Sequence, residues 1–279
     1  MLSLIGLGLG DARDITLRGL ELVKSAQEVY LEAYTSLLSY GISTRELSEF
    51  YGVEVRVLDR EDVETNIDAI LERAETKDIC ILVVGDPFGA TTHCDLYLRA
   101  QERGVCVTVV HNASIINAVA CTGLQLYRFG ETVSLVFWTD SCQPDSYADK
   151  ITRNIRNGLH TLCLLDIRVK ERTLEGMMKN KKIYEEPRYM SVAEAAEQLV
   201  TIAGRRKDSG HPVEFDENTM CVGLARVGWT DQKIVSGTLG ELSSCDLGPP
   251  LHSLVVCGQL HHMETDMLKL WKQKQSCDK

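Results

Sequence analysis

The chain has 279 residues, of which 44% are hydrophobic and 25% charged, and its formal net charge is −10. This hydrophobic content excludes a disordered chain, and the acidic balance argues against a nucleic-acid partner, which requires a basic surface. No apolar run approaches the roughly 20 residues that span a bilayer, and the ten cysteines contain no Cys-x-x-Cys pair typical of zinc sites. We therefore expect a cytoplasmic globular protein without a metal or a membrane segment.

Apolar runs alternate with amphipathic stretches in the first part of the chain. They predict strands at 2–6, 29–34, 53–58, 79–84 and 105–110, and helices at 15–26, 63–74 and 95–103. Ser43 and Glu46 have the spacing of a capping box that opens a further short helix. The run 79–84 is the most apolar of the chain, as is typical of a central parallel strand. This βα alternation predicts a mainly parallel sheet with helices on both faces.

The pattern changes near residue 113. The apolar stretch 113–126 predicts a helix that connects two halves of the chain. Further strands are predicted at 133–138, 161–167, 220–226, 233–236 and 253–256, and a helix at 191–203 opens with Ser191 and Glu194 in a second capping box. Because this half has more strands per helix, we expect a mixed sheet. The predicted domains are 1–112 and 113–279, both α/β, with a flexible segment at 205–218.

A glycine-rich turn, Gly6 to Asp11, follows the first predicted strand. Glycines between a strand and a helix let a ligand approach the backbone closely. A dinucleotide-binding fingerprint, and with it a nicotinamide oxidoreductase, requires a third glycine three positions after the second. Asp11 occupies that position and places a negative charge where a pyrophosphate would lie. A tight turn without a ligand is an equally good interpretation at this point.

Two more loops follow predicted strands at the same sheet edge. Ligands of open α/β sheets bind beyond the carboxyl ends of the strands. The first loop, 85–93, contains Asp86, which can accept hydrogen bonds, and two threonines, 91 and 92, which can cap the next helix. The second loop begins at His111 and contains Ser114, which can cap a helix or contact a ligand. A structured turn is the alternative for each loop, and Asp166, Arg226 and His252 are weaker candidates at strand ends.

Together these motifs resemble the diphthine synthase family, within the tetrapyrrole-methylase-like class of methyltransferases. The resemblance covers most of the chain and is carried by residues 6–11, 31–36, 85–93, 111–117, 137–140, 160–167, 187–192, 224–228, 231–234 and 250–253. It implies two α/β domains, a homodimer, and S-adenosylmethionine as methyl donor in the cleft between the domains. The positions that match the donor contacts of the family are Leu9, Asp86, Gly89, Ser114, Ile115, Leu165, Val227 and His252.

The resemblance also implies a reaction. Family members methylate a 3-amino-3-carboxypropyl group on a histidine of elongation factor 2, which would be the protein substrate. The amine receives three methyl groups, and in the eukaryotic type, which the motifs resemble more closely, a carboxylate receives a fourth. No catalytic base is assigned, and Asp86 and His252 are interpreted as donor-positioning residues. A trimethylating diphthine synthase, a tetrapyrrole methylase and a non-catalytic binding module remain alternatives.

Overall fold

The computed structural model describes residues 1–32, 43–58, 67–91, 93–169 and 184–272. The chain forms two compact units. The first consists of Met1–Ala118 and Gly228–Thr230, and the second of Val119–Val227 and Asp231–Lys279. The domain boundary at residue 112 stays a prediction. The family-like stretch 33–36, the predicted helix start at 63–66 and Thr92 lie outside the described residues.

The first unit contains a five-stranded parallel sheet with the order β3-β2-β4-β1-β5. Its strands are β1 (Leu2–Gly6), β2 (Glu28–Glu32), β3 (Val55–Leu58), β4 (Ile79–Val83) and β5 (Val107–Val110). Every residue of β1 and β4 is buried. Continuous apolar runs are expected of strands that are covered on both faces, so the predicted parallel sheet is confirmed.

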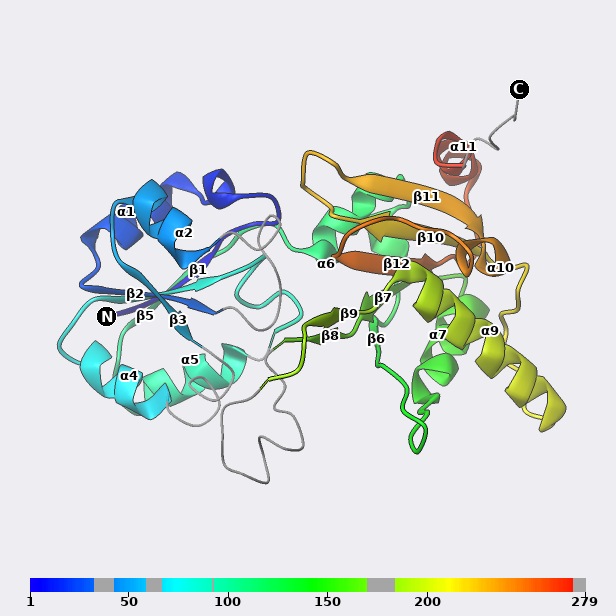
Figure 1. Cartoon of the computed structure of the whole chain (residues 1–279), viewed down its shortest axis with the longest axis horizontal. Helices are drawn as coiled ribbons and strands as arrows, with labels where there is room; N and C mark the ends of the chain where they lie inside the picture. Colours follow the sequence, from blue (N-terminus) through cyan, green and yellow to red (C-terminus); the bar gives the residue numbers. More distant parts are fainter. Residues whose placement is uncertain (33–42, 59–66, 92, 170–183, 273–279) are drawn as a thin grey trace. The chain divides into compact units, whose positions relative to one another are not determined.

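Helices cover both faces of this sheet (Figure 1). The helical elements of this unit are η1 (Ala12–Asp14), α1 (Leu17–Ser25), α2 (Thr44–Tyr51), α4 (Ile67–Ala74), α5 (His93–Glu102) and α6 (Ile115–Ala118). α1 and α2 pack on one face, in a core that includes Val23 and Leu47, and α4 and α5 pack on the other, in a core that includes Leu71 and Leu96. The capping box of Ser43 and Glu46 opens α2 as predicted.

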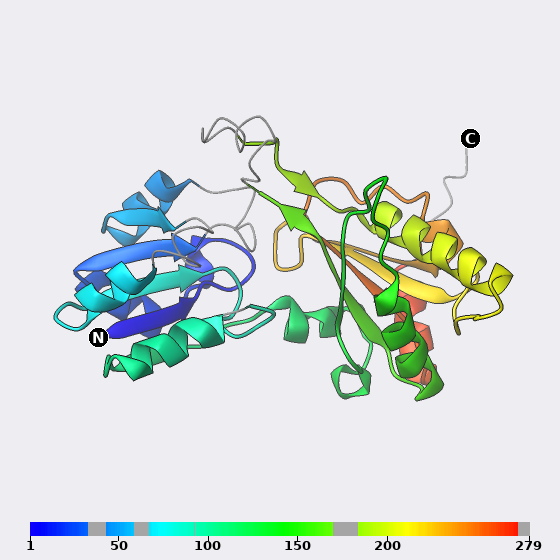
Figure 2. The ribbon, with the colours of Figure 1, turned by 90° about the horizontal axis from the view of Figure 1, so that it is seen from below.

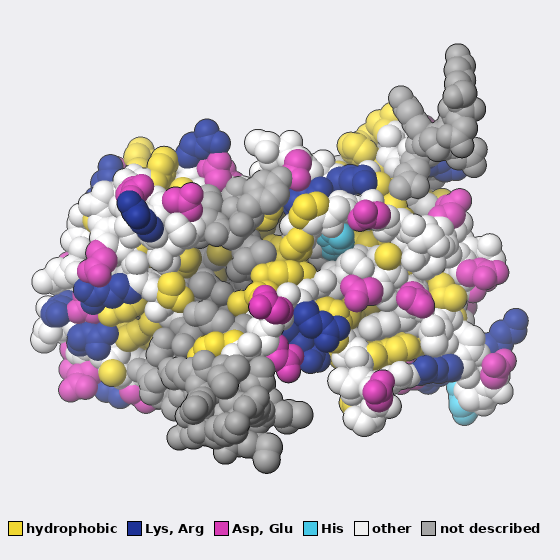
Figure 3. Space-filling view, in the orientation of Figure 1, with side chains coloured by type: hydrophobic (Ala, Val, Ile, Leu, Met, Phe, Trp, Pro, Cys, Tyr) yellow, Lys and Arg dark blue, Asp and Glu magenta, His cyan; other side chains and the backbone are white. Residues whose placement is uncertain are grey.

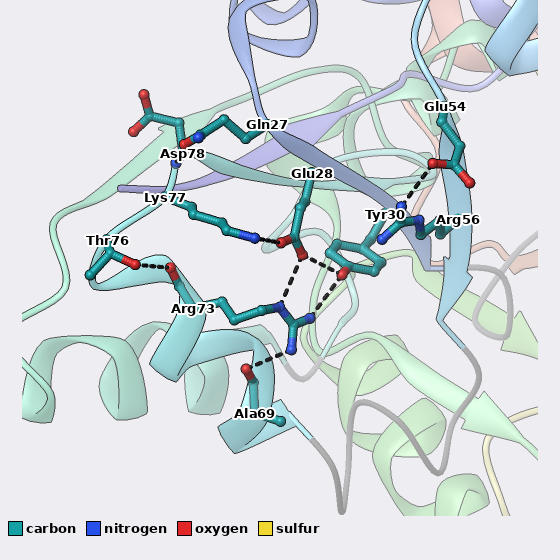
Figure 4. A network of polar contacts seen from close by, with 10 residues as sticks. All are labelled: Gln27, Glu28, Tyr30, Glu54, Arg56, Ala69, Arg73, Thr76, Lys77 and Asp78. Atoms are coloured by element: carbon teal, nitrogen blue, oxygen red, sulfur yellow. Dashed lines mark hydrogen bonds and ion pairs between the residues drawn. The ribbon is translucent and has the colours of Figure 1, made fainter.

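A charged network joins elements at the amino ends of β2 and β4 (Figure 4). The Glu28 carboxylate, 8% exposed, receives Lys77 Nζ at 2.7 Å and Arg73 Nε at 3.0 Å. The hydroxyl of Tyr30 donates to the same carboxylate at 2.6 Å. Hydrogen bonds from Lys77 and Tyr30, which outweigh the effect of burial, lower the pKa of Glu28 to about 2.

The second unit contains a mixed sheet with the order β11-β10-β12-β7-β6. The pair β6–β7 is parallel and the other three pairs are antiparallel. The strands are β6 (Val133–Leu135), β7 (Thr161–Leu165), β10 (Met220–Ala225), β11 (Lys233–Thr238) and β12 (His252–Val256), and a separate two-stranded sheet is formed by β8 (Ile167–Arg168) and β9 (Arg188–Tyr189). The predicted mixed sheet is confirmed.

The core of the second unit lies between this sheet and helices on one of its faces. The helical elements are η3 (Val119–Thr122), η4 (Leu126–Arg128), α7 (Ser146–Arg156), α9 (Val192–Asp208), α10 (Leu239–Leu242) and α11 (His262–Leu270). Residues of α7, α9 and α10 share one apolar cluster with alternate residues of the strands. Figure 2 shows α9, in yellow-green, lying along this sheet. α11 is tied to β11 through Ser236 Oγ, which donates to the Leu268 carbonyl at 2.6 Å.

Three sequence predictions are wrong in detail. The helix expected over 113–126 is only four residues of α6 followed by η3, and Gly123 then adopts a φ of +89° that ends the helical stretch. The strand expected over 161–167 breaks at Asp166, between β7 and β8. Helix α9 continues to Asp208, so the beginning of the segment predicted to be flexible is helical.

Three further features of the described residues concern membrane-spanning helices, metal-binding clusters and the distribution of surface charge. Among them, no helix combines the length and apolarity that crossing a membrane requires. Likewise, no cluster of His, Cys, Asp and Glu side chains in the described ranges has the arrangement of a metal site. On the face drawn in Figure 3, basic and acidic side chains are interspersed.

Candidate functional site

The glycine turn after β1 and the loop after β4 pair with each other. Gly8 N–H donates to the Gly85 carbonyl at 3.1 Å, and Gly85 N–H donates to the Gly8 carbonyl at 2.7 Å. Both glycines have positive φ, +76° and +81°, which L-residues adopt only with strain. Two of the predicted ligand loops therefore form one piece of ordered backbone at the carboxyl edge of the sheet.

Asp86 orders the same edge through main-chain donors. Its Oδ1 accepts the Phe88 N–H at 2.8 Å, and its Oδ2 accepts the Asn112 N–H at 3.0 Å and His111 Nδ1–H at 2.9 Å. Burial acts to raise the pKa of Asp86, but these hydrogen bonds outweigh it and hold the pKa below its ordinary value. The carboxylate is therefore ionised at neutral pH. Because a carboxylate has about four acceptor positions, Oδ1 retains capacity for a further donor.

Asn112 and Ser114 bring the loop after β5 into the same group. Asn112 Nδ2 donates to the Gly6 carbonyl at 2.9 Å. A Cβ built on Gly89 would lie 2.6 Å from Ser114 Oγ, so only a glycine fits at that position without displacing its neighbour. Ser114 is buried, and Ile115 begins α6 directly after it. Five of the predicted donor contacts thus belong to three loops that touch one another.

The main chain at Leu9 is held by a residue from a distant part of the sequence. Trp229 belongs to the first unit, and its indole Nε1–H donates to the Leu9 carbonyl at 2.7 Å. The next residue, Gly10, donates its N–H to Asp14 Oδ2 at 2.8 Å. The carboxylate of Asp11 accepts the Arg13 N–H and caps η1. The turn is therefore fixed on both sides of Leu9.

The other three predicted donor contacts share one edge of the second sheet. His252 begins β12 and lies opposite Ala225 of β10, while the residue after it pairs with Leu164 of β7. Leu165 is the last residue of β7, and Val227 follows the end of β10 by two residues. This register places Leu165, Val227 and His252 near one another.

The hydrogen bonds of His252 fix its tautomer. Nδ1 accepts the Val192 N–H at 3.2 Å, whereas Nε2 lies 3.1 Å from the Gly248 carbonyl and 3.0 Å from the Pro249 carbonyl. Because carbonyls only accept, Nε2 carries the proton and the ring is neutral. Burial lowers the pKa of His252, and the carbonyl contacts oppose that shift only in part. With both nitrogens engaged, this geometry suits a positioning residue better than a base.

Arg226 ties together the loops that carry Val227 and His252. Its guanidinium is 5% exposed and donates to Asp231 Oδ2 at 2.6 Å and to the Leu247 carbonyl at 3.1 Å. It also donates to the Pro249 carbonyl, beside the His252 contact. The φ of Arg226, +52°, turns the chain sharply after β10. Arg226, a weaker candidate for the site in the sequence, therefore has a structural role that holds these loops together.

Comparisons with known proteins agree with this arrangement. Residues 1–243 match the family model described as Tetrapyrrole (Corrin/Porphyrin) Methylases. Diphthine methyl ester synthase of Homo sapiens is 58% identical over 272 residues, covering 97% of this chain and 95% of the relative. The chain belongs to the diphthine synthase family of the tetrapyrrole methylases. The resemblance inferred from the motifs is confirmed, and the chain is a methyltransferase by family.

Less similar relatives also align with this chain over nearly its full length. Diphthine methyl ester synthase of Dictyostelium discoideum is 48% identical, covering 99% of this chain and 100% of the relative. A crystal structure of a diphthine synthase is 34% identical with a TM-score of 0.81, covering 97% of this chain and 95% of that one. A solved structure from Entamoeba histolytica is 46% identical with a TM-score of 0.84, covering 98% and 99%. The fold class predicted from the sequence is therefore confirmed.

Sequence reasoning missed some residues that shape this site. Trp229 gave no signal, because a tryptophan in a polar loop is usually explained by local packing. Glu32 and His93 were quoted only as parts of motifs, without a role. A signal for Glu32 existed, since this carboxylate directly follows the apolar run 29–31, and it is fully buried in the structure.

Proposed function

We propose that this protein transfers methyl groups from S-adenosylmethionine to the 3-amino-3-carboxypropyl-histidine of elongation factor 2. Three transfers go to the amine and a fourth goes to the carboxylate, giving diphthine methyl ester. The identity of 58% with the human diphthine methyl ester synthase, over nearly the whole of both chains, carries this proposal. S-adenosylmethionine supplies an electrophilic methyl group on a sulfonium.

The residues present suit this donor. In the first unit, the loops that contain Leu9, Asp86, Gly89, Ser114 and Ile115 offer main-chain groups, and Asp86 Oδ1 can accept from a hydroxyl or an amine. In the second unit, Leu165, Val227 and His252 offer apolar surface and a neutral imidazole. We propose these eight residues as the donor contacts.

The task of these groups is alignment. Methyl transfer is an in-line displacement, and well-oriented reactants lower a barrier by roughly 7–11 kcal/mol. The hydrogen bond from Trp229 to the Leu9 carbonyl and the close approach of Gly89 to Ser114 restrict main-chain motion in these loops. Alignment of the donor requires such a restriction. Elongation factor 2 as protein partner, a homodimeric assembly and a cytoplasmic location belong to the same proposal.

Mass spectrometry of the acceptor peptide tests the reaction. The purified chain is incubated with labelled S-adenosylmethionine and elongation factor 2 that carries the unmethylated aminocarboxypropyl-histidine. A gain of four methyl groups supports the proposal, and a gain of three identifies a trimethylating diphthine synthase. Donor binding without any transfer would overturn the substrate assignment and leave the family assignment in place.

A tetrapyrrole methylase is the second candidate, because the matching family model includes enzymes of that class. Incubation with a corrin precursor in place of elongation factor 2 separates the two. Transfer to the corrin precursor alone would replace the proposed substrate.

A further inference from the structure

His93 places a buried, unpaired ring nitrogen next to the loop after β4. The side chain is 2% exposed and stands on the buried face of α5, with Leu96 and Ala100 one and two turns further on. Its Nε2 is the buried side-chain polar atom that has no hydrogen-bond partner among the described residues. An apolar side chain would fill this position without the cost of burying an unpaired polar atom.

The partner of the other ring nitrogen settles the chemical state of Nε2. Nδ1 lies 3.2 Å from the Pro87 carbonyl, within the loop that also holds Asp86 and Gly89. Because a carbonyl only accepts, Nδ1 carries the hydrogen and donates it. Nε2 therefore presents a lone pair. Burial lowers the pKa of His93, with the charge of Glu32 opposing that shift, so the ring is neutral at pH 7 and Nε2 carries no proton.

Glu32 supplies a negative charge that acts on the His93 ring. It is the last residue of β2, is fully buried, and pairs in register with Val83 at the end of β4. The carboxylate and the imidazole thus both belong to the carboxyl edge of the sheet, where the donor loops lie. A neutral base beside a carboxylate can bind an ammonium group and hold the proton that it releases, because the carboxylate stabilises the resulting imidazolium.

We propose that His93 Nε2 accepts the proton of the substrate amine before each N-methylation, with Glu32 as the charge that stabilises the protonated ring. This inference rests on the proposed function and assigns the base that the donor contacts do not provide. The alternative is a structural role, in which a buried water satisfies Nε2.

An N–H bond of the substrate ammonium breaks as the Nε2–H bond forms, and the freed electron pair attacks the methyl carbon. The new N–C bond forms while the S–C bond breaks, leaving its electrons on sulfur. The imidazolium then gives its proton to water that enters as the products leave, before the next transfer. A carboxylate carries no proton at neutral pH, so formation of the methyl ester does not require His93.

This difference between the amine and the carboxylate gives the test. The full-length protein and its His93→Gln variant are assayed with labelled S-adenosylmethionine on two forms of elongation factor 2, one unmethylated and one already trimethylated. Glutamine keeps a donor for the Pro87 carbonyl but has no basicity. We expect N-methylation to fall roughly 100-fold at pH 7, with ester formation unchanged. Glu32→Gln should show the same pattern with a smaller loss.

A pH series and a second buried histidine distinguish basicity from packing. Raising the pH should restore N-methylation in His93→Gln, because solvent then deprotonates the amine. His160→Gln is the matched control, since His160 is 0% exposed and both of its nitrogens are bonded, to Gly258 N–H and to Glu264. We expect it to slow both steps alike, without recovery at high pH.

Either of two results would overturn the inference: equal slowing of both steps by His93→Gln, or N-methylation at the unmodified rate. Failure of the proposed function gives a different result. The unmodified protein would then bind the donor but transfer no methyl group to either form of elongation factor 2, and the role of His93 would fall with it.

Discussion

At the two edges of the first unit's sheet, where the strands begin and where they end, carboxylates are bonded by different kinds of group. At the amino edge, the Glu28 carboxylate is neutralised by the side chains of Lys77 and Arg73 and bonded by Tyr30 (Figure 4). At the carboxyl edge, two of the three groups that bond Asp86 are main-chain N–H donors.

This contrast indicates that the amino edge contributes to stability and the carboxyl edge to ligand binding. A carboxylate held by cationic side chains has little left to offer a ligand, and its main effect is to hold β2 and α4 together. A carboxylate held by main-chain N–H groups orders its own loop and keeps an acceptor position on the side of the ligand. Changes at the carboxyl edge should therefore alter donor affinity, whereas changes at the amino edge should alter the free energy of unfolding.

The largest effect is expected from Gly89→Ala. The new Cβ would lie 2.6 Å from Ser114 Oγ and 2.7 Å from Ser114 Cβ, so one loop must move away from the other. A displacement of this kind at an alignment site costs on the order of 100-fold, and we expect that loss in affinity for S-adenosylmethionine by calorimetry. Gly204→Ala makes the same chemical change in α9 with no atom within 4 Å, and should leave donor affinity unchanged. Equal affinities of the two variants would contradict the contact between the loops.

Asp86→Asn should have the next largest effect. An amide nitrogen would face the N–H donors of Phe88 and Asn112, or an amide oxygen would replace a charged acceptor. Loss of hydrogen bonds to a charged group costs about 2 kcal/mol, which corresponds to roughly 30-fold in donor affinity. Isothermal titration of the variant measures this directly. An unchanged dissociation constant would mean that Asp86 orders the loop without contacting the donor.

Parts of this fold were predictable from the sequence because burial on both faces leaves a plain pattern. The strands 2–6 and 79–84 read as continuous apolar runs, and they are the buried centre of the parallel sheet. The stretch 113–126 misled because apolar composition does not distinguish an α-helix from η3, and because Gly123 lies so close to Met267 that a Cβ there would be 2.6 Å from the Met267 Cβ. Local sequence carries no information about that contact.

In the candidate site too, some features could be predicted from the sequence and others could not. The glycine loops were predictable, since each follows a buried strand at the carboxyl edge. The bond from Trp229 to Leu9 joins residues far apart in sequence, and neither residue indicates its partner. The Glu28 network was also unpredictable, because charges at strand ends ordinarily indicate a solvated edge rather than a buried carboxylate.

Glu28→Gln tests the amino edge. The pKa of Glu28 is lowered from 4.5 to about 2, so its stabilising effect is fully present above about pH 4.5 and is lost as the pH falls toward 2. We expect the variant to lose about 2 kcal/mol of unfolding free energy at pH 7, measured by urea denaturation. The difference from the unmodified protein should shrink as the pH falls below 4.5. Donor affinity at pH 7 should not change, and a loss there would break the separation between the two edges.

Glu54→Gln should have the smallest effect. It tests whether the stabilisation at the amino edge comes from the burial of the Glu28 carboxylate. Glu54 pairs with Arg56 at 2.8 Å in the same region, but both side chains are exposed, at 73% and 53%. Solvent screens such a pair, and ordering two long side chains opposes the attraction, so exposed ion pairs add little stability. We expect a urea midpoint that cannot be distinguished from that of the unmodified protein. If Glu54→Gln destabilised the protein as much as Glu28→Gln does, the amino edge would owe its effect to the number of charges present. A null result beside a clear loss in Glu28→Gln assigns that effect to the burial of one carboxylate among its donors.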